Sequence, residues 1–138
     1  MAKVKLVKHN FLVDLAVYPF QIMVSVNQTN KDLKKTLKEL NITDIDIDEV
    51  YSNITVGSCN IFPGNKILLR LNEFDKECDQ CRGTLVHEAF HATHFVMDTT
   101  GMQLSFENDE AFAYLIGFLT EQIFKELNKN EQQQRKGN

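Results

Sequence analysis

Residues 54–71, with the sequence ITVGSCNIFPGNKILLRL, decide which fold we expect for this chain. Two apolar runs rich in strand-forming residues flank the tripeptide Pro-Gly-Asn at positions 63–65, which is typical of a tight turn. The pattern predicts a β-hairpin with strands over residues 54–62 and 66–71. The rest of the chain is then expected to add further strands to this hairpin and helices to cover it.

The segment before the hairpin is expected to supply two more strands and a short helix. Residues 3–6 alternate between polar and apolar, and residues 21–26 (QIMVSV) are rich in strand formers. Thr29 or Asn30 can cap the helix that follows, whose leucines are spaced to form one apolar face. Alternating apolar residues from 45 to 50 indicate a further strand or turn.

Two long helices are expected after the hairpin, over about residues 79–98 and 108–128. Thr-Thr-Gly at positions 99–101 is a stop signal between them. Strands followed by helices indicate an α+β domain, in which a small, twisted, mostly antiparallel sheet packs against the two long helices. That single domain would cover residues 1–127, and residues 128–138 (NKNEQQQRKGN) would form a disordered polar tail.

The composition argues against several classes of protein. The chain has 138 residues, of which 43% are apolar and 25% charged, as in a globular domain. Its 15 lysines and arginines are scattered and its net charge is −4, which argues against a nucleic-acid partner. We find neither an apolar leader nor a run of about 18 apolar residues, so no signal peptide and no membrane partner are expected. Three cysteines, an odd number, fit a reducing compartment, and we therefore predict a cytoplasmic protein.

Residues 87–91 (HEAFH) form an H-E-x-x-H motif inside the first of the two long predicted helices. Residues four apart lie on the same side of a helix, one turn along, so the imidazoles of His87 and His91 can bind one metal ion. Glu88 lies about 100° around the helix from His87, where it can take a proton from a water at the metal. We expect the opposite face of this helix to pack on the sheet through Val86, Phe90, Thr93 and Met97.

A catalytic zinc ion usually takes three protein ligands, so a third ligand is expected beside the two histidines. Glu110 follows His91 after eighteen intervening residues, at the start of the second long helix. The helix is strongly apolar, and a carboxylate so close to a core needs a partner such as a metal ion. Glu107 and Asp109 are the alternatives, although Asp109 can instead cap the helix. We therefore predict one zinc ion per chain, held by His87, His91 and Glu110.

This ligand spacing resembles that of the zincin metallopeptidases, in particular the branch with a glutamate ligand, the gluzincins. Residues 110–113 (EAFA) look like the Glu-Gly-Phe-Ala stretch of the aminopeptidase-type members. The hairpin before the motif is similar to the thermolysin-type arrangement, in which an edge strand binds the substrate backbone. The chain also resembles small H-E-x-x-H proteins of phages and mobile elements. The resemblance covers residues 54–125 and implies a minimal zincin-like fold.

The resemblance implies a zinc metallopeptidase that hydrolyses peptide bonds. Zinc would acidify a water and polarise the scissile carbonyl, while Glu88 would act as the general base and pass the proton to the leaving amine. A donor for the developing oxyanion is also needed, for which Tyr114 is the first candidate and His94 the second. A peptide or protein substrate would bind along the edge strand from Gly57 to Phe62.

Other residues near the motif have less specific interpretations. His94 lies nearly two turns from His87, so we expect it to line the site rather than to bind the metal. Cys78 and Cys81 begin the same helix, where we expect a redox pair or two plain reduced thiols rather than a zinc site. Cys59 is expected to be a small buried apolar residue.

A second class of function is open to the same residues, namely a non-catalytic binding module in which the metal ion only locks the two long helices together. Glu88 distinguishes the two classes, because a structural site does not need a base beside an open coordination position. In a structural site, replacement of Glu88 by glutamine should change neither the metal content nor the function.

Overall fold

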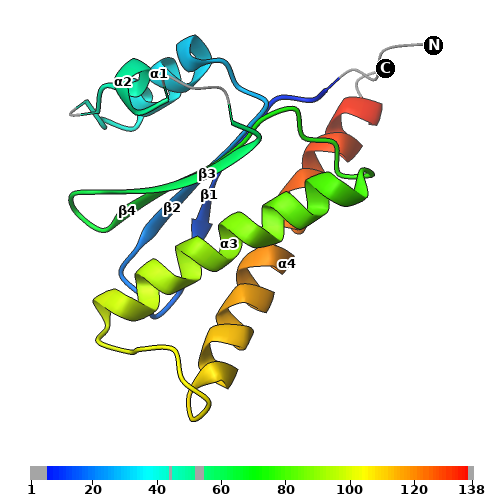
Figure 1. Cartoon of the computed structure of the whole chain (residues 1–138). Coiled ribbons are helices and arrows are strands. Elements are labelled where there is room, and N and C mark those ends of the chain that lie inside the picture. Colours follow the sequence, from blue (N-terminus) through cyan, green and yellow to red (C-terminus); the bar gives the residue numbers. More distant parts are fainter. Residues whose placement is uncertain (1–5, 44, 52–54, 137–138) are drawn as a thin grey trace.

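The computed structural model describes residues 6–43, 45–51 and 55–136 of the chain. Within these residues the chain forms a four-stranded mixed sheet and four helices, so its fold class is α+β (Figure 1). Along the chain the elements are β1 (His9–Asp14), β2 (Gln21–Val26), α1 (Asn30–Glu39), α2 (Ile47–Val50), β3 (Gly57–Phe62), β4 (Lys66–Leu71), α3 (Asp79–Thr99) and α4 (Asp109–Lys136).

The four strands are ordered β1-β2-β4-β3, so β1 and β3 are the edges of the sheet. The predicted hairpin is confirmed from Gly57 onward, because β3 and β4 pair antiparallel with Gly57 opposite Leu71. β1 and β2 also pair antiparallel, whereas the two central strands run parallel with Ile22 opposite Ile67. A parallel neighbour needs a crossover connection, which here consists of α1, α2 and β3.

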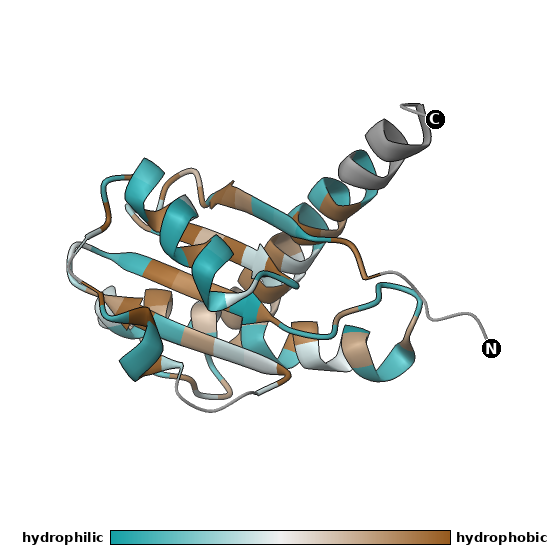
Figure 2. Ribbon diagram, turned by 90° about the horizontal axis from the view of Figure 1, so that it is seen from above, coloured by the Kyte–Doolittle hydropathy of each residue, from teal (hydrophilic) through white to brown (hydrophobic). Residues whose placement is uncertain are grey.

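The two faces of the sheet bury different helices. Side chains alternate between the faces along a strand, so Ile22 and Val24 of β2 join α3 and α4 in the larger of two core clusters. Met23, between them in the sequence, belongs to a smaller cluster with α1 and α2. The domain therefore has three layers, with the sheet in the middle (Figure 1). Seen from above, the central strands are largely hydrophobic and the outward turns of α1 hydrophilic (Figure 2).

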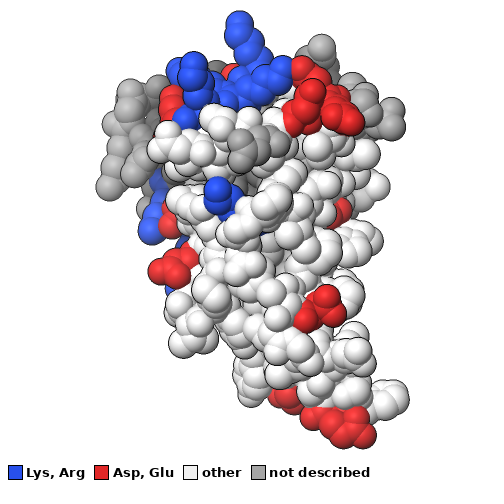
Figure 3. All heavy atoms as spheres, turned by 90° about the vertical axis from the view of Figure 1, so that its left-hand side faces the viewer, with Lys and Arg blue, Asp and Glu red and all other residues white. Residues whose placement is uncertain are grey.

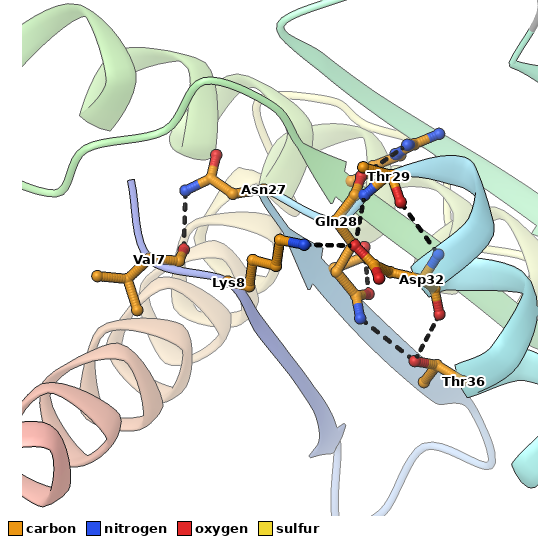
Figure 4. A network of polar contacts seen from close by, with 9 residues as sticks. Val7, Lys8, Asn27, Gln28, Thr29, Asp32 and Thr36 are labelled. Atoms are coloured by element: carbon orange, nitrogen blue, oxygen red, sulfur yellow. Dashed lines mark hydrogen bonds and ion pairs between the residues drawn. The ribbon is translucent and has the colours of Figure 1, made fainter. Parts of the chain in front are cut away.

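Helix α1 begins where the sequence predicts, with Thr29 as its N-cap. The Thr29 hydroxyl accepts the N–H of Asp32 at 3.1 Å, and the Asp32 carboxylate accepts the N–H of Thr29 at 3.1 Å, which completes a capping box. Lys8 donates to the same carboxylate at 2.9 Å (Figure 4). The hydrogen bond from Lys8, followed by those with Thr29, lowers the pKa of Asp32 to about 2. The segment before β1 is thus tied to the start of α1.

The side chain of Asn27, which follows β2, forms hydrogen bonds with the loop that leads from β4 to α3. Its side-chain amide donates to the carbonyl oxygen of Val7 at 2.8 Å (Figure 4). The same amide donates to the carbonyl oxygen of Phe74 at 2.8 Å, and the side-chain oxygen of Asn27 accepts the N–H of Phe74 at 2.8 Å. Asn27 itself has a φ of 57°, a left-handed conformation that asparagine tolerates better than most residues. These hydrogen bonds connect the end of β2 to the segment that leads into α3.

The structure differs from the sequence-based expectations in two segments, residues 45–50 and the C-terminal tail, and a third expectation lies mostly outside the described residues. Most of the strand expected over residues 3–6 lies outside the described residues, and the first strand that the structure shows is β1. Residues 45–50 were expected as a strand or turn, but residues 47–50 form α2, because the Asp46 carboxylate caps a helix by accepting the N–H groups of Asp48 and Glu49. α4 continues to Lys136 and so includes most of the expected polar tail. Glutamate, glutamine, lysine and arginine are good helix formers, so the lack of apolar residues does not end a helix.

The remaining elements agree with the sequence. Strand β2 covers the predicted residues 21–26, and the two long helices begin within one residue of the predicted starts. In the part of the chain that the structure describes, no helix is both long and apolar enough to cross a membrane.

Candidate metal centre

Helix α3 carries the H-E-x-x-H motif and packs on the sheet through small and aliphatic side chains. The fully buried stripe consists of Leu85, Ala89, Ala92 and Val96. The expected packing face is therefore only partly correct, because Thr93 and Met97 are buried but Val86 and Phe90 are 44% and 37% exposed. The observed stripe leaves the histidines of the motif on the opposite, exposed side of the helix.

The imidazoles of His87 and His91 turn towards each other on this exposed side. Their Nε2 atoms are 3.2 Å apart, and the rings meet edge to face with centroids 4.9 Å apart. Two nitrogens bound at roughly 2.0–2.1 Å to one tetrahedral zinc ion lie about 3.3 Å apart, so the pair fits two corners of such a site. The same distance also lets one neutral imidazole donate a hydrogen bond to the other.

Glu88 is placed between the histidines and the buried stripe, and only 7% of its surface is exposed. Strand β3 passes directly over it. A β-carbon on Gly57 would lie 3.0 Å from both Cγ and Oε1 of Glu88 and 2.7 Å from Cγ2 of Thr84. Burial and, after it, the negative charge of Glu88 raise the pKa of the Cys59 thiol on β3 to about 12. The carboxylate of Glu88 thus lies against the edge strand of the sheet.

An open depression of about 380 Å³ lies beside Glu88, where the chain enters β3. Its wall on the strand side is formed by Thr55, Val56 and Gly57. Its wall on the helix side is formed by Gly83, Thr84, His87 and Glu88. The depression therefore gives a small molecule or a peptide access to one histidine and the carboxylate of the motif.

The residues predicted on α4 are exposed, and Glu110 does not complete a group of three metal ligands with the histidine pair. Glu110 is exposed in the first turn of α4, and Tyr114, one turn later, is 75% exposed. Among residues 6–43, 45–51 and 55–136, no group of three or more histidine, cysteine, aspartate or glutamate side chains is arranged to hold a metal ion. The two alternatives, Glu107 and Asp109, are exposed as well. Glu110 as third ligand and Tyr114 as oxyanion donor therefore stay predictions.

His94 lies on the exposed side of α3, where its ring stacks on that of Phe90 with centroids 6.2 Å apart and planes inclined by 18°. This contact holds the ring along the surface of the helix, one turn beyond His91. Sequence reasoning named Gly57 only as the start of the substrate-binding edge, and it missed that Gly57 and Thr84 bring β3 and α3 together at Glu88. A glycine inside a strand is a signal for such a close approach of the backbone.

The charged side chains on the surface of the molecule are unevenly distributed. On the side shown in Figure 3, basic side chains gather at the top with a group of acidic side chains beside them, and the broad surface below carries fewer charges. The exposed lysines of α1 are Lys31, Lys34, Lys35 and Lys38. Lys34 forms an ion pair with Asp48 of α2. The exposed lysines of α1 thus lie on the face of the sheet opposite to α3, which carries the candidate centre.

Comparison of the chain with protein-family models, with curated proteins and with solved structures finds no match. The resemblance to zincins therefore rests on the sequence motif alone and stays a prediction.

Proposed function

We propose that this protein is a zinc-dependent metallopeptidase whose active centre lies between α3 and the edge strand β3. The observation that carries the proposal is the pair of Nε2 atoms of His87 and His91, 3.2 Å apart on the exposed side of α3. Glu88, the residue that the motif assigns as general base, is buried directly beside this pair and beside the depression. A pair of imidazoles with a buried carboxylate next in the sequence to one of them supports the proposal, because metal-assisted hydrolysis needs both metal ligands and a base near the metal.

In this proposal His87 and His91 would hold one zinc ion, and Glu110, which the sequence spacing selects, would be the third ligand. When bound, zinc supplies a Lewis acid that favours both the ionisation of a water and the polarisation of a carbonyl group. Glu88 accepts the proton from the attacking water and delivers it to the leaving amine. Tyr114 is the proposed donor to the developing oxyanion. The minimal zincin-like packing of the H-E-x-x-H helix under the sheet is part of the same proposal.

The proposed substrate is a peptide in an extended conformation that pairs with β3. The order of the strands places β3 at an edge of the sheet, paired with β4. The backbone groups along the other side of an edge strand are available to an added strand, a common mode of peptide recognition. The start of β3 at Gly57 borders both Glu88 and the depression. A peptide paired with β3 would therefore pass the candidate centre.

The metal is tested by elemental analysis of the purified full chain and of three variants. We expect about one zinc ion per chain, its loss in His91→Ala, and its retention in His94→Ala, which removes an exposed histidine of the same helix. Glu110→Gln should lower zinc affinity if Glu110 is the third ligand and leave it unchanged otherwise. A folded chain that does not take up added zinc would contradict the proposal.

Hydrolysis is tested separately, by incubating the zinc-loaded protein with a mixture of unstructured peptides and identifying the products by mass spectrometry. We expect cleavage by the parent protein and its loss in Glu88→Gln, with the zinc content unchanged. If the zinc-loaded parent cleaves nothing and Glu88→Gln keeps the same zinc content and stability, the metal ion serves a non-catalytic module instead.

A further inference from the structure

The beginning of α3 carries two cysteines, which the proposed peptidase mechanism does not use. Cys78 is the N-cap of the helix, and its sulfur accepts the backbone N–H of Cys81 at 3.4 Å. The thiol of Cys81 is 3.6 Å from the carbonyl oxygen of Glu73, to which it can donate. Both cysteines are half-buried free thiols. The two sulfurs thus belong to a single polar arrangement at one helix end.

Sulfur is an unusual atom to find in this capping position. Oxygen-bearing side chains such as serine, threonine, aspartate and asparagine are the preferred N-caps, because a neutral thiol is a weak acceptor. A thiolate is a much better acceptor, and the positive end of the helix dipole stabilises it. The geometry at Cys78 therefore favours the reactive form of the thiol.

The two thiols differ in acidity in the way that a nucleophile and its partner differ. Interaction with the Cys81 side chain, followed by the backbone N–H groups of Cys81 and Gln80, holds the pKa of Cys78 below its ordinary value. Burial and the neighbouring Cys78 sulfur raise the pKa of Cys81. Residues at an N-cap and three positions later are also close enough for a disulfide, which needs α-carbons roughly 4.4–6.8 Å apart. Cys78 is thus the more acidic thiol and the candidate nucleophile, and Cys81 is the less acidic thiol.

We propose that Cys78 and Cys81 form a thiol–disulfide exchange site, whose substrate is an accessible disulfide of a small molecule or a protein. The Cys78 thiolate attacks one sulfur of the substrate, R–S–S–R′, so that a bond forms between Cys78 and R–S while R′–S⁻ leaves and takes up a proton. Cys81 then loses its proton and attacks the sulfur of Cys78. The Cys78–Cys81 disulfide forms, and R–S⁻ leaves with the proton released by Cys81. The protein dithiol is oxidised by two electrons and the substrate disulfide is reduced to two thiols.

This inference does not depend on the proposed peptidase activity, because the exchange site uses none of the metal-centre residues. Cys59 provides an internal reference. Its thiol has a pKa raised to about 12 by burial, followed by the charge of Glu88, so it should be inert at neutral pH. In the native chain, we therefore expect a thiol-specific alkylating agent to modify Cys78 at least tenfold faster than Cys59. An equal rate at the two positions would overturn the proposal without any variant being made.

The exchange reaction is tested by treating the full-length reduced protein with oxidised glutathione and analysing quenched samples by mass spectrometry. The parent should form the Cys78–Cys81 disulfide and retain no glutathione. Cys81→Ser should accumulate one glutathione on Cys78, because the resolving thiol is missing. Cys78→Ser should acquire glutathione at least tenfold more slowly than Cys81→Ser does. Serine is a preferred N-cap, so Cys78→Ser keeps the helix start, which circular dichroism checks. Equal glutathione uptake by the two variants, or a parent that forms no Cys78–Cys81 disulfide, would refute an exchange site.

Discussion

Gly57 of β3 lies so close to Glu88 of α3 that a β-carbon at position 57 would be 3.0 Å from the carboxylate oxygen Oε1. This contact joins the edge strand of the sheet to the central residue of the H-E-x-x-H motif. Glu88 as a whole is only 7% exposed, while both histidines of the motif are exposed. The position of the candidate general base therefore depends on a residue that has no side chain.

Substitution of Gly57 by alanine should destabilise the protein by about 1–3 kcal/mol, the usual cost of overpacking, because the new methyl group would clash with Thr84 and Glu88. Gly83→Ala is the matched control in α3. A β-carbon there meets no atom of the described chain within 4 Å, and alanine favours a helix over glycine by roughly 0.8–1.0 kcal/mol. Urea unfolding should thus show opposite signs for the two variants. A Gly57→Ala variant as stable as the parent would mean that β3 can move away from α3 at little cost.

A pair of adjacent residues tests which face of α3 is buried. Leu85 is fully buried in the larger core cluster, so Leu85→Ala should lower the free energy of unfolding by about 2–5 kcal/mol. Val86 is 44% exposed, and Val86→Ala should change it by less than about 0.5 kcal/mol. Thermal or urea unfolding of the two variants measures the difference. If Val86→Ala were the more damaging substitution, α3 would be rotated from the orientation described above.

The error in the predicted face of α3 has a physical cause. Sequence reasoning placed Val86 and Phe90 on the packing face because they lie on the side of the helix opposite the motif. The helix instead packs through a stripe that includes Ala89 and Ala92, whose small side chains allow α3 to approach the sheet closely. The glycine at position 57 on the facing strand has the same effect. Close approach is a property of two elements together, which the periodicity of one helix does not reveal.

In the candidate centre too, the features that depend on local sequence could be predicted, and those that depend on the tertiary path of the chain could not. The approach of His87 to His91 follows from helical periodicity alone, and the sequence predicts it. The capped start of α1 and the hairpin of β3 and β4 are also local, and both predictions are confirmed. The position of Glu110 relative to the histidines depends instead on the path of the chain between α3 and α4. The motif specifies only how many residues separate Glu110 from His91, and this number does not determine the path of the chain between α3 and α4.

The capping box of α1 should make the stability of the protein depend on pH in the acid range. Hydrogen bonds from Lys8 and with Thr29 lower the pKa of Asp32 from 3.8 to about 2. A lowered pKa in the folded state means that the ionised carboxylate contributes stability above the unfolded pKa, and that this contribution is lost as the pH falls through the folded pKa. The parent should therefore be more stable than Asp32→Asn at pH 7, and the difference should shrink between about pH 4 and pH 2.

Urea midpoints measured at pH 7, 4 and 2 test this dependence. Lys8→Met is the control, because it removes the largest cause of the shift and leaves the bonds with Thr29 in place. It should lower stability at pH 7 by less than Asp32→Asn does. A difference between the parent and Asp32→Asn that stays constant down to pH 2 would show that the charge of Asp32 is not the source of the stabilisation.

Zinc should stabilise the folded protein if His87 and His91 form part of a metal site, because a ligand that binds only the folded state shifts the unfolding equilibrium. At a free zinc concentration 100 times the dissociation constant, the gain is about 2.7 kcal/mol, and a chelator should reverse it. The effect should disappear in His91→Ala and persist in His94→Ala.

The other interpretation of the distance of 3.2 Å between the Nε2 atoms is a hydrogen bond between neutral imidazoles. In that case added zinc would leave the unfolding temperature unchanged, and His91→Ala would cost about 0.5–1.5 kcal/mol whether or not zinc is present. Unfolding of the parent and of the two variants, each with zinc and with chelator, therefore separates a metal site from a simple hydrogen-bonded pair.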